Sequence, residues 1–183
     1  MKTDARVTYT RKIIRETFIE LLRKQPINKI TVKKICESAQ INRTTFYKHF
    51  ADPYDLMQNI EDETIEELFH LIDESNDKSF EQTMFVILNA VQENKAFYQT
   101  VFYNQDAHGF NEKLILLCYQ AKQPEINRKL FLSTIKEQEW FYYFMTQGLC
   151  SILDCWIKDG MNDNTQMISR FLGKMHVILT KDG

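Results

Sequence analysis

Residues 29–57 read KITVKKICESAQINRTTFYKHFADPYDLM, and this stretch decides the fold of the first part of the chain. Thr31 is a favourable N-cap, and the residues after it place apolar side chains at the spacing i, i+3, i+4 and i+7. This apolar stripe consists of Val32, Ile35, Cys36 and Ala39. The predicted helix is only about two turns long, so it must pack against neighbouring helices to be stable.

A second short helix is predicted after the tight connection SAQIN, with Asn42 as its N-cap. Phe46 and Phe50 lie four residues apart, so both rings can point inward together with Ile41. The side chains that fall on the other faces are Arg43, Thr44, Tyr47 and Lys48. The helix therefore hides its rings and presents cations and hydroxyl groups to a partner with hydrogen-bond acceptors.

The remainder of the chain also favours helices, because breakers are few and strand-like alternation is scarce. The sequence holds only 5 Gly and 3 Pro. Asp52 and Pro53 make a favourable N-cap and first position for a long helix, and Gly160 is suited to end a helix in the left-handed conformation. The further helices expected are Asp4–Lys24, 53 to about Ser75, Phe80–Glu93, Lys95–Tyr103, Gly109–Lys122, Phe131–Asp159 and Asp163–Leu179. The predicted fold class is all-α.

Charge is divided unevenly along the 183 residues, although the formal net charge is only −2. Residues 1–50 contain 12 Lys and Arg against 4 Asp and Glu, whereas the remainder contains 11 against 21. A basic first quarter on an acidic body indicates a local surface for a polyanion, although charge alone also fits a plain solvated face.

No apolar run at the N-terminus is typical of a signal peptide, and the stretch WFYYFM at 140–145 is far too short to cross a bilayer. We therefore expect a cytoplasmic protein that does not enter a membrane. The four cysteines form no CxxC pair, which favours buried thiols over a redox or metal site. No metal and no cofactor are expected.

Two short helices joined by a brief turn, inside a basic segment, describe a helix-turn-helix, whose second helix enters the major groove of double-stranded DNA. Arg43 can donate paired hydrogen bonds to guanine, and the two threonines after it can contact bases or phosphate. The basic and aromatic side chains that follow suit backbone phosphates, as do the hydroxyl and free N–H groups around Thr31. For His49, simple packing beside Phe50 is an equal alternative. The predicted DNA-binding residues are Thr31, Asn42, Arg43, Thr44, Thr45, Tyr47, Lys48 and His49.

The quoted stretch resembles the DNA-binding region of the TetR family of bacterial transcriptional regulators, over about residues 9–60. The Thr-Val pair, the Thr-Thr-Phe-Tyr run, the aromatic that closes the second short helix and the Leu after it fall at the family's spacing. Two residues depart from the pattern. Gln40 stands in the turn where the family usually has Gly, and at positive φ it would cost on the order of 1 kcal/mol. Pro53 stands where the family often has Lys, which should remove one phosphate contact.

The charge division and the resemblance together predict two domains, a helix-turn-helix domain at 1–51 and a helical effector-binding and dimerisation domain at 52–183. The helix at 140–157 is apolar on nearly every side, so it must be covered on more than one face. Two helices from each subunit would form a four-helix homodimer interface. The residues predicted for it are Ile152, Trp156, Ile168, Phe171, Leu172 and Met175. YYFMTQGLCSILDCWIKDG also resembles the C-terminal region of a TetR subgroup that includes dihydroxyacetone-kinase regulators.

TetR-like bodies commonly hold an effector pocket, so the resemblance implies an unknown small-molecule effector. Aromatic side chains with few polar neighbours could line such a cavity. The candidates are Phe102, Tyr103, Tyr119, Trp140, Tyr143, Phe144 and Gln147. Rings at helical spacing are more often plain core, and this remains the competing interpretation.

The predicted function is a sequence-specific DNA-binding transcriptional regulator, a ligand-responsive repressor that acts as a homodimer on a palindromic operator. An enzyme is not expected, because the four His are scattered and no HExxH, GxSxG or Gly-rich phosphate loop is present. The alternative is a helical protein-interaction module or coregulator of the same fold with weakened DNA binding. Gln40 and Pro53 argue for that alternative, whereas the cations of the second short helix argue against it.

Overall fold

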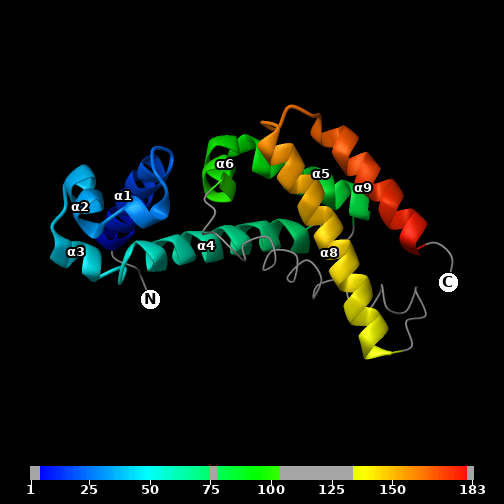
Figure 1. The fold of residues 1–183 in the computed structure, drawn as a ribbon, viewed down its shortest axis with the longest axis horizontal. Helices are drawn as coiled ribbons and strands as arrows, with labels where there is room; N and C mark the ends of the chain where they lie inside the picture. Colours follow the sequence, from blue (N-terminus) through cyan, green and yellow to red (C-terminus); the bar gives the residue numbers. More distant parts are fainter. Residues whose placement is uncertain (1–4, 75–77, 104–133, 181–183) are drawn as a thin grey trace. The chain divides into compact units, whose positions relative to one another are not determined.

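The computed structural model describes residues 5–74, 78–103 and 134–180, and every element in these ranges is a helix (Figure 1). The elements are α1 (Ala5–Leu22), η1 (Ile27–Lys29), α2 (Val32–Ala39), α3 (Arg43–Tyr47), α4 (Pro53–Asp73), α5 (Phe80–Glu93), α6 (Lys95–Tyr103), α8 (Ile135–Lys158) and α9 (Thr165–Thr180). The all-α prediction is confirmed. The bounds of α5 and α6 agree with those predicted, the short η1 was not foreseen, and the helix predicted at 109–122 lies outside the described residues.

The chain divides into two compact units. The head unit comprises Met1–Thr64 with Thr100–Ala107, and the body unit comprises Ile65–Gln99 with His108–Gly183. The division falls inside α4, so this helix contributes residues to both units. The domain boundary predicted at 51/52 stays a prediction.

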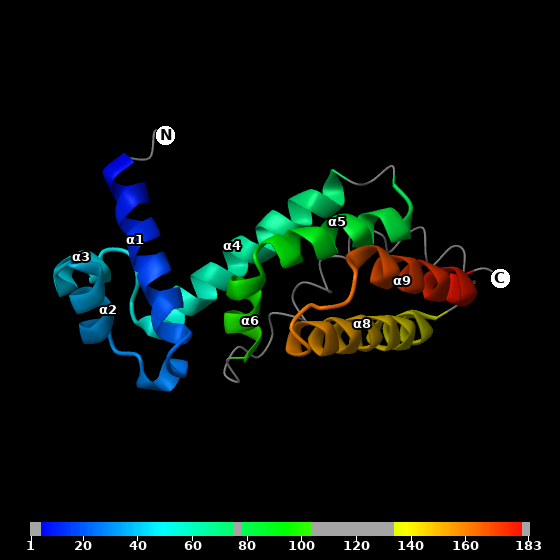
Figure 2. The ribbon, with the colours of Figure 1, turned by 90° about the horizontal axis from the view of Figure 1, so that it is seen from above.

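The core of the head unit is built where α1, α2 and α3 gather at the start of α4 (Figure 2). Ile14 and Phe18 of α1, Ile35 of α2, Phe46 of α3 and Leu56 of α4 are fully buried. Removing each such side chain from water contributes about 1.5–3 kcal/mol, which is what stabilises helices as short as α2 and α3. Ile35 and Cys36 of α2 and the rings of Phe46 and Phe50 are buried as the spacing predicted, whereas Val32 and Ala39 are only half-buried.

The body unit is organised by α5 and α9, which pack along one another (Figures 1 and 2). The apolar contribution of α5 comes from Ile87, Leu88 and Val91, which are buried. The approach is close at Gly173, where an added Cβ would lie 2.8 Å from the Cβ of Glu81. A hydrogen bond from Thr165 Oγ1 to Asn89 Oδ1, 2.7 Å long, joins the start of α9 to α5.

The C-terminal end of α8 is packed into the core of the body unit. Trp156 is only 2% exposed, and its Nε1–H donates to the carbonyl of Asp163 at 3.1 Å. Gly160 has φ 80° and Met161 has φ 53°, so two consecutive left-handed residues turn the chain toward α9. The prediction that Gly160 ends its helix in this conformation is confirmed.

The cysteines follow the expectation only in part. Cys36 and Cys150 are buried, and burial raises the pKa of the Cys36 thiol above its ordinary value. Cys155 is exposed because it lies on the outward face of α8, so the expectation of a buried thiol was wrong at this position.

No helix in the described ranges is long and apolar enough to span a membrane.

Candidate nucleic-acid interface

The turn between α2 and α3 depends on one residue in a rare backbone conformation. Gln40 ends α2 with φ 55° and ψ 42°, in the left-handed region. The backbone N–H groups of Gln40 and Ile41 both donate to the carbonyl of Cys36, the second over 3.0 Å. The turn therefore needs a positive φ where this chain has Gln, and the local strain expected from the sequence is present.

The two helices of the motif are capped as the sequence predicted. The Thr31 hydroxyl accepts from the backbone N–H of Lys34 at 3.3 Å, and Asn42 Oδ1 accepts from the backbone N–H of Thr45 at 2.7 Å. The Thr45 hydroxyl also donates to Asn42 Oδ1 at 2.9 Å. Asn42 and Thr45 therefore hold the first turn of α3 in place, and their polar atoms are partly committed to that role.

The outward face of α3 carries the charged and hydroxylated side chains. Phe46 is fully buried and meets the Tyr47 ring edge-on, with centroids 5.8 Å apart. Tyr47 itself is 57% exposed, which leaves its phenol accessible. The other predicted DNA-binding residues that are exposed are Thr31, Asn42, Arg43, Thr44 and Lys48, whereas Thr45 and His49 are half-buried. Cations and hydroxyls on one short, capped helix are the groups that recognise base edges and phosphates.

Two roles were considered for His49, namely contact with a phosphate and packing beside Phe50. Its ring centroid is 6.3 Å from that of Phe50. The pKa of His49 is lowered from its ordinary value by partial burial, and further by the positive charges of Arg11 and Lys48. This lowering disfavours the charged imidazolium in the free protein, so His49 adds less to the positive charge of the head than Arg11 or Lys48 does.

The start of α4 differs from a phosphate-binding helix end. Pro53 has no backbone N–H and is buried, and Asp52 Oδ1 accepts from the N–H groups of Tyr54 at 2.7 Å and Asp55 at 2.9 Å. These donors are satisfied by a carboxylate of the chain itself. The helix start therefore offers few free backbone donors to a phosphate, and the loss of a phosphate contact expected from Pro53 stays a prediction.

Two exposed phenols in the head unit were not among the predicted site residues. Tyr54 is 52% exposed on the first turn of α4, and Tyr9 is exposed on α1. For Tyr9, a tyrosine outside the apolar stripe of a basic helical segment was the sequence signal that could have identified it, whereas Tyr54 begins the acidic helix α4 and had no such signal. Each can donate a hydrogen bond to a phosphate oxygen.

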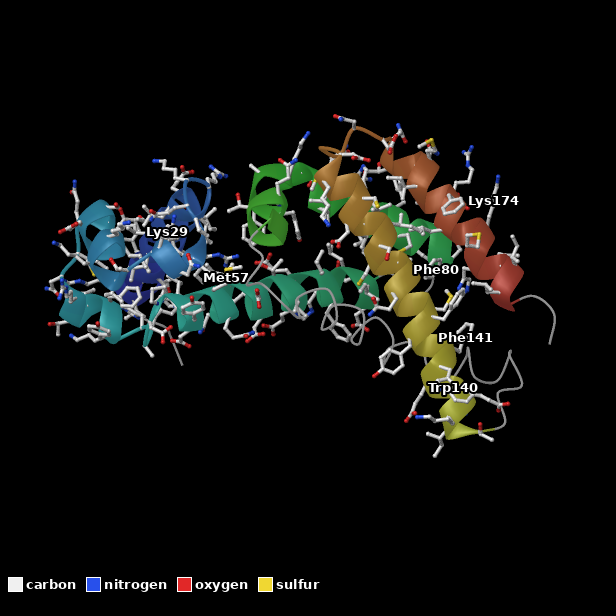
Figure 3. All side chains as sticks on the ribbon, in the orientation of Figure 1. Lys29, Met57, Phe80, Trp140, Phe141 and Lys174 are labelled. Atoms are coloured by element: carbon white, nitrogen blue, oxygen red, sulfur yellow. The ribbon has the colours of Figure 1, made fainter. Side chains whose placement is uncertain are left out.

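The structure describes only part of the predicted effector set. Trp140, which Figure 3 labels near the N-terminal end of α8, is exposed, and so are Tyr143, Phe144 and Gln147. Tyr119 lies outside the described residues, and the side chains of Phe102 and Tyr103 are not among those described. The effector pocket therefore stays a prediction.

In the described part of the chain, no group of three or more His, Cys, Asp or Glu is placed to hold a metal ion.

The residues predicted for the dimer interface divide into two groups. Trp156, Ile168 and Leu172 are buried within their own protomer, whereas their sequence pattern predicted contact with a second chain. Phe171 and Met175 are exposed on α9, and Ile152 is half-buried on α8. The exposed face of α9 also carries Lys174, which Figure 3 labels, together with Met167 and Ile178.

Comparisons with known proteins identify transcriptional regulators that are similar to this chain. A family model described as the C-terminal region of transcriptional regulators matches residues 78–176. The curated protein named HTH-type dhaKLM operon transcriptional activator DhaS, from Lactococcus lactis subsp. lactis (strain IL1403), is 31% identical over 93 residues. This match covers 51% of the chain and 49% of that protein, so the chain spans about half the length of this curated relative.

Two solved structures share the fold over nearly the whole chain. A TetR transcriptional regulator from Streptococcus agalactiae 2603V has a TM-score of 0.72 at 19% identity, covering 93% of this chain and 94% of its own. The Dihydroxyacetone kinase operon activator DhaS has a TM-score of 0.63 at 20% identity, covering 94% and 96%. At these identities the likeness establishes the fold alone.

Proposed function

The chain belongs to the TetR family of DNA-binding transcriptional regulators, and from this premise we propose that it reads a palindromic operator as a homodimer. The observation that carries the proposal is the exposed face of α3, where Arg43, Thr44, Tyr47 and Lys48 point away from the buried Phe46. Arg43 is proposed to read guanine, and Tyr47 and Lys48 to bind backbone phosphates. The basic head supplies the general attraction to DNA.

The proposed homodimer is supported by the apolar side chains that α9 leaves exposed. Met167, Phe171, Met175 and Ile178 recur at spacings of four, four and three residues, which places them on one face of the helix. Such a stripe on a surface is typical of an interface with another chain. A two-fold axis through it would present two copies of α3 to two half-sites.

We propose that an effector, if bound by the body, changes DNA affinity through α4. This helix runs without a break from Pro53 to Asp73 and belongs in part to each unit. A ligand can shift the equilibrium only by its differential affinity for the two arrangements. Repression is the sign that the family resemblance implies, whereas the curated relative DhaS is named an activator, which makes activation a second candidate.

The test is selection of bound duplexes from a random pool, followed by affinity measurements on the selected sequence. A palindromic consensus is expected. Arg43→Ala should relax base preference by about 1–3 kcal/mol, whereas Lys48→Ala should weaken all sequences alike and reduce the salt slope by about 1. If no duplex is enriched and neither substitution alters binding, the chain is instead a protein-interaction module of this fold. A reporter gene behind the selected operator then distinguishes repression from activation.

A further inference from the structure

Arg11 of α1 is held between two partners in the head unit. Its guanidinium carbon lies 5.2 Å from the centroid of the Phe50 ring, and its Nη2 lies 3.1 Å from Glu63 Oε1. Arg15, one turn further along α1, places Nη1 2.6 Å from Glu63 Oε2. One carboxylate of α4 therefore binds two successive arginines of α1, and one of these covers an aromatic ring.

The ring that Arg11 covers belongs to the segment that closes the recognition helix. The backbone N–H of Phe50 donates to the carbonyl of Phe46 at 3.0 Å, and the two ring centroids are 5.8 Å apart. Phe50 is buried, although it follows α3 and a turn. A helix of five residues cannot hold its own orientation, so α3 takes its direction from the contacts of Phe46 and Phe50.

Packing alone does not confine Arg11. A groove of about 510 Å³ runs between α1 and α4, and its lining includes Arg11, Arg15, Phe50 and Glu63. Arg11 and Glu63 are each about two-fifths exposed at the side chain, so the guanidinium has space to leave the ring. The charged hydrogen bond from Arg11 Nη2 to Glu63 Oε1 therefore adds a restraint that packing does not supply.

We propose that Glu63 is a positioning residue for DNA reading, which holds Arg11 over Phe50 and so fixes the orientation of α3. This rests on the proposed function, because the orientation matters only if α3 reads a duplex. Glu63 is not proposed to touch DNA. It acts through Arg11, and Arg15 anchors the other oxygen of the same carboxylate.

When the charge of Glu63 is removed, a positioning role and simple electrostatics predict opposite changes in the affinity for the operator. Removing a carboxylate makes the head more positive, so long-range attraction alone would strengthen binding to any duplex. Loss of a positioning contact would instead weaken binding to the selected operator, and less so to a scrambled duplex. Glu63→Gln keeps the size of the side chain and removes its charge, so it separates the two effects.

The experiment compares wild type, Glu63→Gln and Glu66→Gln, which removes an exposed carboxylate further along the same helix. Glu63→Gln should weaken operator binding about three- to tenfold and lower the ratio of operator to scrambled affinity. The salt slope should not change, since no phosphate contact is lost. In a variant that already carries Arg11→Met, adding Glu63→Gln should weaken operator binding no further. If part of the Glu63→Gln protein were misfolded, its apparent affinities for the operator and for the scrambled duplex would fall alike. An unchanged ratio of the two affinities therefore argues against positioning.

A second measurement needs no DNA. The amide protons of His49 and Phe50 both donate to the carbonyl of Phe46, at 2.9 and 3.0 Å. Glu63→Gln should speed hydrogen exchange at these two amides and leave the amides of α5 and α9 unchanged. If exchange at 49 and 50 does not change, positioning by Glu63 is overturned even when the wild type binds its operator. If exchange changes but the wild type selects no duplex, the proposed function fails and the local contact stands.

Discussion

Replacement of Gln40 by Gly should stabilise the head unit, because the backbone there already has the conformation that Gly adopts freely. Gln40 has φ 55° and ψ 42°, and a side chain in this region costs about 1–2 kcal/mol. Gly also gives the unfolded chain more freedom, which offsets about 0.4–1 kcal/mol of that gain. The difference between these two ranges is about 0–1.6 kcal/mol, and its middle, about 0.5–1 kcal/mol, is the expected net stabilisation.

Urea unfolding of wild type and Gln40→Gly measures this difference directly. The midpoint should rise while the slope of free energy against urea stays the same, since the folded surface does not change. In a thermal scan, a chain of this length should gain about 1–4 °C in Tm, since 1 kcal/mol corresponds to about 2–4 °C. Hydrogen exchange at Ile41, whose N–H is bound to the Cys36 carbonyl, should become slower or stay the same.

Gln40→Ala is the matched control for this prediction. Ala removes the same polar group but keeps a Cβ, so the left-handed backbone should cost as much as before. An equal stabilisation by Ala and Gly would show that the side chain, not the backbone, is responsible. A loss of stability in Gln40→Gly would refute the left-handed turn itself.

Three further changes test the caps, the helix packing and the dimer. Asn42→Ala should cost about 1 kcal/mol in urea unfolding and weaken operator binding, whereas Asn42→Ser, which keeps an acceptor for the Thr45 N–H, should retain most of both. Gly173→Ala should destabilise the body unit by about 1–3 kcal/mol because its Cβ would meet Glu81, whereas Gly148→Ala, with nothing within 4 Å, should gain about 0.5–1 kcal/mol. Phe171→Asp should give monomers by light scattering, while the exposed Gln166→Asp on the same helix should not; a Phe171→Asp dimer would contradict the proposed interface.

Much of the fold followed from features that act over a few residues. Thr31, Asn42 and Asp52 are caps whose function depends on the next three N–H groups, so the starts of three helices could be predicted. The four-residue spacing of Phe46 and Phe50 predicted which face of α3 is buried. Charge is additive along the chain, so the basic head was visible from composition. The exposed side chains of α3 were therefore identified from the sequence, and their role in binding DNA stays a prediction.

Contacts between residues far apart in the chain were decided only by the tertiary structure. The ion pairs of Glu63 with Arg11 and Arg15 join residues 52 and 48 positions apart, and no local pattern selects one carboxylate among the many of that helix. The burial of Trp156 inside its own protomer was likewise hidden, because an apolar side chain suits a core and an interface equally well. Sequence determined the caps, the buried faces and the charged surface, since these depend on neighbours along the chain. Which distant groups meet depends on how helices pack, and this the tertiary structure alone decided.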